Sequence, residues 1–334
     1  MRVRKLEQEE HGKTKSLYKE VFTQDSQSFV DYYYKEKTKD NQIYVAENGE
    51  EICAMLHLNP YTLMVNGKEK ESNYIVAVAT KESYRRRGIM RKLLTKALMD
   101  MYEENYTFTF LMPAAESIYL PYDFRTVYEQ EHVYYSVEDQ KSEFDICELE
   151  NEECEELANV MNHKLFYNYH VFAKRTDDYY KRLKKEYASD GARLMIYRKN
   201  SEIADVRPQV PDEDIIKGTM PKIMIRIVDV RRMLMSLRLK SLMALCFHVT
   251  DPVIEENNRC IVMTGTEFSG VMLMDSKPEN SEGTITIAAL SSLLFGAKTV
   301  EEICEEDGVK MSERMKGEMK KIIPLSKIYL NEIV

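Results

Sequence analysis

The sequence has no long hydrophobic run and no apolar segment near its start. No window approaches the roughly 18 consecutive apolar residues that a membrane span requires. The opening MRVRKLEQEEHGKTKSLYKE also lacks the apolar core of a signal peptide. We therefore expect a cytoplasmic protein with no membrane partner.

Metal-binding patterns are missing as well. The six cysteines form no CxxC pair, and the six histidines are too dispersed for a zinc site, so we expect no metal. Several cysteines sit inside apolar runs such as SLMALCFHV. We interpret the cysteines as small core residues of a protein in a reducing compartment.

Positive charge is in deficit, because 47 Lys and Arg residues face 56 Asp and Glu residues and give a net charge of −9. Nucleic-acid binding depends on neutralising phosphates with Lys and Arg, so the sequence argues against a nucleic-acid partner. A cationic small molecule suits this charge better. The length of 334 residues predicts two or three domains.

What the sequence does contain is an alternation of strands and helices in its first third. MRVRKL alternates like an edge strand, and the next two segments, EEHGKTKSLYKEVF and SQSFVDYYYKEK, have helical spacing. Asn-Gly turns at NQIYVAENGEEICAMLHL and at LMVNGKEKES predict two hairpins. The strands YIVAVAT and YTFTFLMP enclose a helix that runs through Met101. This order predicts an α/β fold.

The densest positive charge lies where the strand YIVAVAT passes into that helix, in the loop ESYRRRG. A helix that begins directly after a strand points its unpaired N–H groups and the positive end of its dipole beyond the strand. Together with Arg85, Arg86 and Arg87, and with Gly88 allowing close approach of the backbone, these groups suit a pyrophosphate. A solvated basic turn is the alternative interpretation.

The segment from Tyr74 to Leu94 resembles the acetyl-coenzyme A signature of the GCN5-related N-acetyltransferase (GNAT) superfamily. That signature is Arg or Gln, two residues, Gly, one residue, and then Gly or Ala. Arg85 and Gly88 fit it, whereas Met90 departs from its last position.

The wider chain is similar to one branch of that superfamily, the Eis-like acetyltransferases. The resemblance rests on NPYTLMVNGKEKESNYIVAVATKESYRRRGIMRKLL, TFTFLMPAAESIYLPYDF, IMIRIVDVRRML and the closing KIYLNEIV, which occur in that order. It implies an α/β (α+β) protein with a GNAT catalytic domain at residues 1–137. It further implies a reduced second GNAT-like domain at 138–222 and a sterol-carrier-protein-like domain at 223–334.

The resemblance also implies which residues bind acetyl-CoA. The strand whose splayed backbone would hydrogen-bond the pantetheine arm contains Val78, Ala79 and Thr80. The loop that would bind the pyrophosphate contains the remaining matched positions, which are Arg85, Arg86, Gly88, Met90 and Arg91. Acetyl-CoA is then a co-substrate, and direct transfer needs no metal.

Tyr119 is the candidate general acid. It precedes Phe124 by five residues and so matches the Tyr-x4-Phe spacing of the family, which implies a phenol near the thioester sulfur. A tyrosine hydroxyl in reach of the departing thiolate can supply its proton. Tyr122 is the second choice, and in a chain with 22 tyrosines an ordinary buried aromatic is the alternative.

The family resemblance implies that the C-terminal carboxylate, here that of Val334, acts as base or as an anchor for the amine. The ending SKIYLNEIV alternates apolar and polar residues, as a docking strand does. Phe22 and Asp25 lie where the family lines its amine pocket, and Glu332, two residues before Val334, is the third candidate for binding the amine. Solvated surface charge is the alternative for both acids.

The rest of the chain carries no second cofactor loop. DICELENEECEELANVMNHKLFYNYHVFAKRTDDYYKRLKKEY predicts a strand and two helices before the strand ARLMIYR, and the following NSEIADVRPQVPDEDIIKGTMPK is polar and contains proline. From Ile223 we expect the helix VDVRRMLMSLRL, three strands and two further helices. We interpret the middle region as a spacer that forms oligomers.

These features predict an N-acetyltransferase that moves the acetyl group of acetyl-CoA to a primary amine of a cationic small molecule, such as an aminoglycoside, a polyamine or a lysine-like group. The resemblance implies a homo-oligomer, either a trimer or a hexamer. The alternative is an acyl-CoA sensor or lipid-binding module without turnover.

Overall fold

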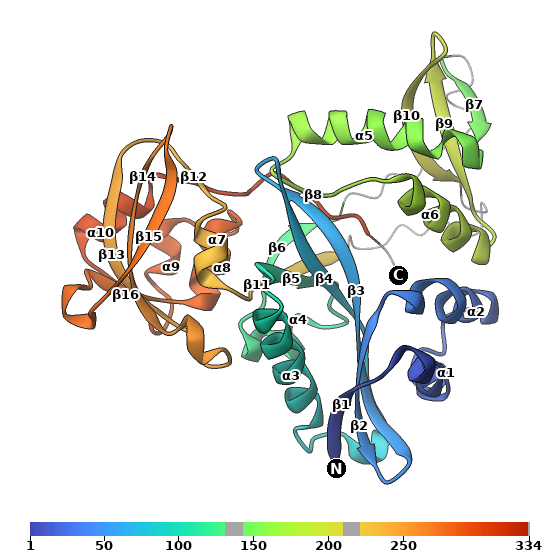
Figure 1. Cartoon of the computed structure of the whole chain (residues 1–334), viewed down its shortest axis with the longest axis horizontal. Coiled ribbons are helices and arrows are strands. Elements are labelled where there is room, and N and C mark those ends of the chain that lie inside the picture. The colour runs from blue at the N-terminus through green and yellow to red at the C-terminus, as the bar shows by residue number, and fades with distance from the viewer. Residues whose placement is uncertain (131–142, 210–220, 333–334) are drawn as a thin grey trace.

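The computed structural model describes residues 1–130, 143–209 and 221–332 of the chain (Figure 1). One large sheet lies at its centre, with the strand order β1-β2-β3-β4-β5-β11-β6. β8 pairs with the last residues of β3, beyond the part of β3 that pairs with β2, and β19 pairs with β8. The strands of this sheet are β1 (Arg2–Lys5), β2 (Gln42–Asn48), β3 (Glu51–Val65), β4 (Lys68–Thr80), β5 (Phe108–Leu111), β6 (Arg125–Glu129), β8 (Val171–Ala173), β11 (Lys222–Ile227) and β19 (Ile328–Tyr329).

Helices cover both faces of this sheet. One face carries α1 (Lys15–Val21) and α2 (Gln27–Glu36), and the other carries α3 (Ile89–Glu103) and α4 (Glu116–Tyr119). Successive residues of β2 alternate between the two, since Ile43 packs with α1 and α2 whereas Tyr44 packs with α3. A strand buried on both faces is apolar throughout, which explains the sequence IYVA at its centre.

The two predicted hairpins are confirmed. In the first, Asn48 pairs with Glu51, so the turn residues are Gly49 and Glu50. In the second the turn is Asn66–Gly67, with φ angles of 50° and 81°. Positive φ at both central residues matches the right-handed twist of the flanking strands. This turn sets the register of β3 against β4 as far as the pair His57–Val76, beyond which the register shifts by one residue.

The middle region forms a small unit of its own (green in Figure 1). Its antiparallel sheet has the order β10-β9-β7 and packs against α5 and α6. The elements are β7 (Asp145–Glu148), α5 (Cys154–Asn168), α6 (Asp177–Ser189), β9 (Arg193–Lys199) and β10 (Glu202–Gln209). We identified no strand in the polar segment that holds β10; Ile203 nevertheless reaches the core, and an edge position tolerates Pro208.

The C-terminal region (orange in Figure 1) packs helices against a second antiparallel sheet with the order β15-β14-β13-β16-β17, in which only the β13–β16 pair is parallel. The strands of this sheet are β13 (Met243–Thr250), β14 (Arg259–Thr266), β15 (Gly270–Ser276), β16 (Gly283–Thr286) and β17 (Lys310–Met311). β12 (Arg238–Leu239) and β18 (Ile322–Ile323) form a separate two-stranded sheet in the same region. The helices of the C-terminal region are α7 (Val230–Leu234), α8 (Ile287–Leu294), α9 (Val300–Ile303) and α10 (Glu313–Met319). Its core continues into the first sheet, where the ring of Phe295 meets that of Phe108 at 5.1 Å.

Strands from all three predicted regions meet in the first sheet. β11, most of which falls in the predicted C-terminal region although the sequence analysis predicted no strand there, lies between β5 and β6, and β8 of the middle region pairs with β3. The closing strand β19 pairs in parallel with β8, so the predicted docking of the C-terminal segment is confirmed as far as Tyr329. Division of the chain at residues 137 and 222 stays a prediction, but residues 223–227 belong to the sheet of the first domain.

No helix in the described ranges is both long and apolar enough to cross a membrane. The expectation of core cysteines is confirmed for Cys53, Cys154 and Cys260 and is wrong for Cys147, which is exposed in β7.

Candidate active site

β4 continues to Thr80, beyond the point where its neighbour β5 ends at Leu111. Within the described residues, their parallel pairing extends only as far as Ile75. Beyond that point β4 contains one residue more than β3, and Ala77 in this bulge has a φ of 49°. A bulge bends a strand and increases its twist. The predicted residues Val78, Ala79 and Thr80 therefore lie where β4 has no paired strand on its β5 side among the described residues; we call this place the opening beside β4.

The loop after β4 delivers unpaired N–H groups to the same end of the sheet. Gly88 caps α3 with a φ of 72°, and open space surrounds the position of a side chain there. The first N–H of the helix to bond back is that of Lys92, which donates to the Gly88 carbonyl at 3.2 Å. The amides of Met90 and Arg91 precede it and remain available to an anion, as is general for the first turn of a helix.

The predicted arginine side chains surround this turn. Arg85 donates from Nε to the carbonyl of Thr80 at 3.1 Å, which fixes its guanidinium at the end of β4. Arg91 lies over the ring of Tyr122 at 5.8 Å, and Arg86 is exposed with a φ of 59°. The structure thus brings the predicted phosphate-binding residues together around the N-terminus of α3.

Tyr119 lies at the end of α4, on the α3 face of the sheet. Its ring packs against Phe124 at 5.9 Å and shares a hydrophobic cluster with Val78 and Met90. Burial raises the pKa of the Tyr119 hydroxyl to about 12, so it keeps its proton at neutral pH. Tyr122, the second choice, is half-buried at the edge of the same cluster.

The opening beside β4 joins two different environments. Val78 and Tyr119 belong to the apolar cluster under α3, whereas Val76 packs with Tyr61 on the opposite face. A group bound at the opening would therefore lie between the cluster that contains Tyr119 and the opposite face of the sheet.

That opposite face holds a cavity of about 260 Å³. Its walls come from the end of α2, from residues 59–62 of β3, from one side of α6 and from Glu332 near the chain end. Asn59 pairs with Tyr74, which directly precedes the last β4 residue paired with β5. The cavity consequently lies beside the start of the opening.

Buried polar atoms without partners line this cavity. Among the described residues no hydrogen bond satisfies Asn41 Oδ1, Asn59 Oδ1 and Nδ2, Glu186 Oε1 or Glu332 Oε2. Unpaired buried polar atoms are rare and costly. Since four of the five accept hydrogen bonds and one donates, the cavity suits a ligand rich in N–H or O–H donors.

Two buried ion pairs support these free oxygens. Lys37 lies 3.1 Å from one oxygen of Glu186, and Arg175 bonds one oxygen of Glu332. Tyr179 also donates to that Glu332 oxygen at 3.3 Å. In each carboxylate the bonded oxygen fixes the group and the other oxygen is left for a ligand.

The lining of the cavity has a small excess of negative charge. Arg182 pairs with Asp40 at 2.9 Å and Lys174 pairs with Glu69 at 2.6 Å. Of the charged lining residues in the described ranges, Asp178 forms no ion pair, and it is exposed. This charge favours the approach of a cation.

The remaining predicted residues divide into three cases. Glu332 lines the cavity, and Val334 lies outside the described residues. Phe22 and Asp25 both contact Tyr18, by ring packing at 4.7 Å and by a 2.7 Å bond from its hydroxyl, and they do not line the cavity.

Sequence reasoning missed several buried polar residues here. His57 is opposite Val76, with Nδ1 2.9 Å from the hydroxyl of Tyr33 and Nε2 without a described partner. Burial lowers the pKa of His57 to about 3, with a smaller contribution from His11. The pattern LHLNP, with polar residues two apart in a buried strand, was the available signal. Glu186 had none, because it comes from the middle region.

Comparison with family models identifies both ends of the chain. Residues 2–127 match the acetyltransferase (GNAT) domain, and residues 230–331 match the sterol carrier protein domain. No curated protein matches the chain. The GNAT match spans β4, the arginine loop and Tyr119.

Solved structures of the same length share the fold. A GCN5-related N-acetyltransferase from Anabaena variabilis is 12% identical with a TM-score of 0.79, and both chains are covered completely. Eis1 from Mycobacterium abscessus is also 12% identical, with a TM-score of 0.72 and complete coverage of both chains. A probable N-acyltransferase from Enterococcus faecalis is 14% identical, with a TM-score of 0.76 over 98% of this chain and 99% of the other.

The predicted resemblance is therefore confirmed at the level of domains and fold. The chain contains an acetyltransferase (GNAT) domain at residues 2–127 and a sterol carrier protein domain at residues 230–331, and it shares the fold of Eis1 along its whole length.

Proposed function

We propose that the protein transfers the acetyl group of acetyl-CoA directly to a primary amine of a cationic small molecule, such as a polyamine, an aminoglycoside or a lysine-like group. One observation carries the proposal. The end of β4 has the cluster that contains Tyr119 on one face of the sheet and, on the other, a cavity lined by buried acceptor atoms without described partners.

The residues around the opening fit acetyl-CoA, which supplies an activated acetyl thioester. Val78 and Thr80 offer main-chain groups to the amides of the pantetheine arm. Gly88, the first turn of α3 and Arg85 suit its pyrophosphate by charge and by free N–H groups.

Tyr119 acts as the general acid in this proposal. When the amine displaces the thiolate, the carbon–sulfur bond breaks and the sulfur needs a proton. A hydroxyl whose pKa burial has raised to about 12 keeps that proton up to the moment of transfer.

The cavity receives the amine. The free oxygens of Glu332 and Glu186 accept its N–H groups, and Asp178 in the cavity lining attracts its positive charge. Attack requires loss of one proton from the ammonium. On the family resemblance, we propose the α-carboxylate of Val334 as the base, two residues beyond Glu332.

The test is release of free thiol from acetyl-CoA with a panel of polyamines, aminoglycosides and lysine peptides. We expect turnover with at least one of them, and Tyr119→Phe should lower kcat by about 100-fold with acetyl-CoA affinity unchanged. Tyr122→Phe is the matched control, because Tyr122 lies in the same cluster, and it should change kcat by less than about threefold.

Two outcomes would contradict the proposal. If acetyl-CoA binds and no amine releases thiol, the protein is an acyl-CoA sensor. If Tyr119→Phe retains full kcat, another group protonates the thiolate. A chain extended by several residues beyond Val334 tests the base, because it should bind acetyl-CoA normally and lose amine turnover.

A further inference from the structure

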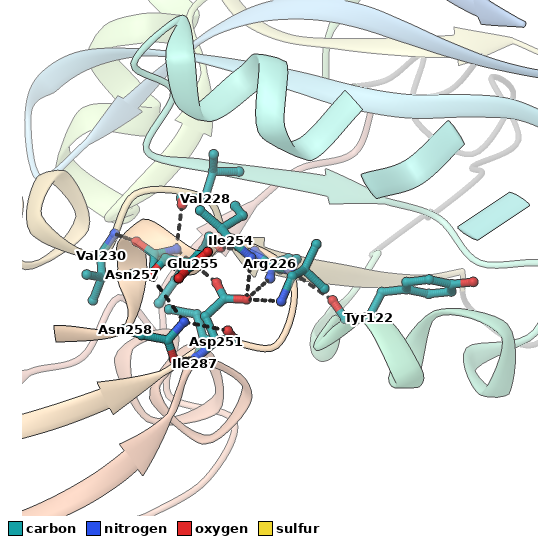
Figure 2. A network of polar contacts seen from close by, with 12 residues as sticks. Tyr122, Arg226, Val228, Val230, Asp251, Ile254, Glu255, Asn257, Asn258 and Ile287 are labelled. Carbon is teal, nitrogen blue, oxygen red and sulfur yellow. Dashed lines mark hydrogen bonds and ion pairs between the residues drawn. The ribbon is translucent and has the colours of Figure 1, made fainter. Parts of the chain in front are cut away.

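A buried arginine in β11 bonds to the segment that carries the candidate acid. Arg226 is fully buried and lies in the first sheet between β5 and β6. Its guanidinium donates from Nε to the carbonyl of Tyr122 at 2.8 Å, from Nη1 to the carbonyl of Ile227 at 2.7 Å and from Nη2 to Asp251 at 2.6 Å (Figure 2).

The sterol carrier protein domain supplies the other half of this network. Asp251 follows β13, and one of its oxygens also accepts from the amides of Val253 at 2.8 Å and Ile254 at 3.0 Å. Its other oxygen accepts from the Asn257 side chain at 2.9 Å, and Asn257 in turn donates to the Val228 carbonyl at 2.8 Å. Both carboxylate oxygens are thus satisfied, which fixes the orientation of the group.

The network reaches Tyr119 by two routes. Tyr122 ends the single turn of 3₁₀-helix, Leu120–Tyr122, that continues α4 directly after Tyr119, so its carbonyl is the far anchor of that short segment. Ile254, from the loop that Asp251 organises, is fully buried in the same hydrophobic cluster as Tyr119 and Phe124. One loop of the sterol carrier protein domain therefore holds the main chain after Tyr119 and packs in the cluster around its ring.

We infer that Arg226 is a positioning residue for Tyr119, and that the sterol carrier protein domain takes part in acetyl transfer by holding Arg226 through Asp251. The inference rests on the proposed role of Tyr119. A general acid must lie within hydrogen-bond reach of the atom that it protonates, and an error of about 1 Å costs up to 100-fold in rate. A short two-turn segment needs an anchor at its end to meet this requirement.

The test removes the ion pair without leaving one charge buried. The double variant Arg226→Met/Asp251→Leu replaces both groups with apolar side chains, an exchange that buried ion pairs often tolerate. We expect the variant to fold, to bind acetyl-CoA normally and to keep its amine KM, while kcat falls by about 10- to 100-fold. The matched control is Arg231→Met/Asp275→Leu, which removes an exposed pair of the same domain at 2.7 Å and should leave kcat unchanged.

Combination with Tyr119→Phe separates positioning from a general loss of order. If Arg226 acts through Tyr119, the double variant should lower kcat in the native background and have little further effect once Tyr119 is phenylalanine. Equal fold losses in both backgrounds would overturn the inference. If Tyr119→Phe alone has no effect, the acid role fails instead, so the two failures are distinguishable.

A second variant covers the case in which the double variant does not fold. Arg226→Lys keeps the charge opposite Asp251, but an ammonium cannot reproduce the planar fork that also reaches the Tyr122 carbonyl. We expect a folded protein with kcat lowered several-fold and an unchanged amine KM. Native kcat in a folded Arg226→Lys protein would contradict the inference.

Discussion

Two buried arginine–carboxylate pairs lie on opposite sides of the active site, and they differ in how completely they are satisfied. Arg226 and Asp251 are fully buried, and both oxygens of Asp251 accept hydrogen bonds. Arg175 and Glu332 are almost as deeply buried, yet Glu332 Oε2 has no described partner and borders a cavity.

We propose that Arg226–Asp251 is a structural pair and that Arg175–Glu332 is part of a ligand-binding site. A buried ion pair recovers its desolvation cost only when the surrounding groups satisfy it fully. Asp251 meets that condition with protein atoms, so its network has no capacity for a ligand. Glu332 does not meet it, and an unsatisfied buried oxygen at a cavity wall is what an amine-binding site requires before its ligand arrives.

The largest expected effect on stability comes from replacing the arginine of each pair, one pair at a time. Arg226→Met leaves Asp251 charged and buried and should lower the free energy of unfolding by about 3–5 kcal/mol. Arg175→Met should cost about 1–3 kcal/mol, because Glu332 keeps the bond from Tyr179 and faces a cavity that water can enter. Urea unfolding of both variants measures the difference, and equal losses would break the comparison.

The face of the sheet that carries the cavity should also make the stability of the protein sensitive to acid. His57 lies on that face, and its Nε2 has no described partner. Burial lowers its pKa from 6.5 to about 3. The unfolded chain therefore binds a proton near pH 6.5, whereas the folded chain does so only near pH 3. Stability from this group is complete above pH 6.5 and is lost as the pH falls, by about 3 kcal/mol between pH 7.5 and pH 4.

His57→Asn should remove that part of the pH dependence while keeping a polar group near the hydroxyl of Tyr33. The measurement is the slope of unfolding free energy against pH, which does not depend on any constant loss from the substitution. His163→Asn is the control, because this histidine is exposed on α5. A variant at position 57 with the native slope would show that His57 is protonated normally in the folded state.

The proposed acetyl-CoA site could be located from the sequence because its residues lie close together in the chain. Arg85, Gly88 and the start of α3 lie within one strand–loop–helix crossover, and Tyr119 is fixed by its spacing to Phe124. Short-range geometry determines such features, so a motif can identify them.

The cavity was not predictable in the same way, because its walls come from separate parts of the chain. Asn59, Glu186 and Glu332 meet only through the docking of α6 and of the closing strand on the first sheet. β11 was missed for a related reason, since its partners β5 and β6 lie about a hundred residues earlier in the chain. The signal at β11 was a single arginine inside the apolar run IMIRI, which indicates a buried charge that needs a partner.

A smaller effect is expected on substrate binding when each carboxylate is made neutral. Glu332→Gln keeps the shape of the side chain and removes its charge, so the KM for a cationic amine should rise about tenfold, equivalent to about 1.4 kcal/mol, with little change in kcat. Asp251→Asn should leave that KM unchanged and lower stability instead. Steady-state kinetics with the best amine of the panel tests both. A larger rise in KM for Asp251→Asn than for Glu332→Gln would reverse the assignment of the two pairs.

The smallest expected effect concerns Asp123, a carboxylate near the Arg226–Asp251 pair that is not fully hydrogen-bonded. Asp123 follows the turn that Arg226 anchors, has a φ of 64°, and its Oδ2 is buried without a described partner. Burial raises the pKa of this carboxyl; Arg226 opposes the shift and Asp251 adds to it. A carboxyl whose pKa is raised by folding stabilises the protein when protonated, and that contribution is lost as the pH rises through its folded pKa.

Asp123→Asn should therefore stabilise the protein at neutral pH by about 0.5–1 kcal/mol, since asparagine tolerates positive φ and carries no charge. The gain should shrink as the pH is lowered toward 4, because the native carboxyl then becomes neutral as well. Asp145→Asn in the exposed part of β7 is the control and should change stability little at either pH. Destabilisation by Asp123→Asn at neutral pH would mean that Arg226 already satisfies this carboxylate.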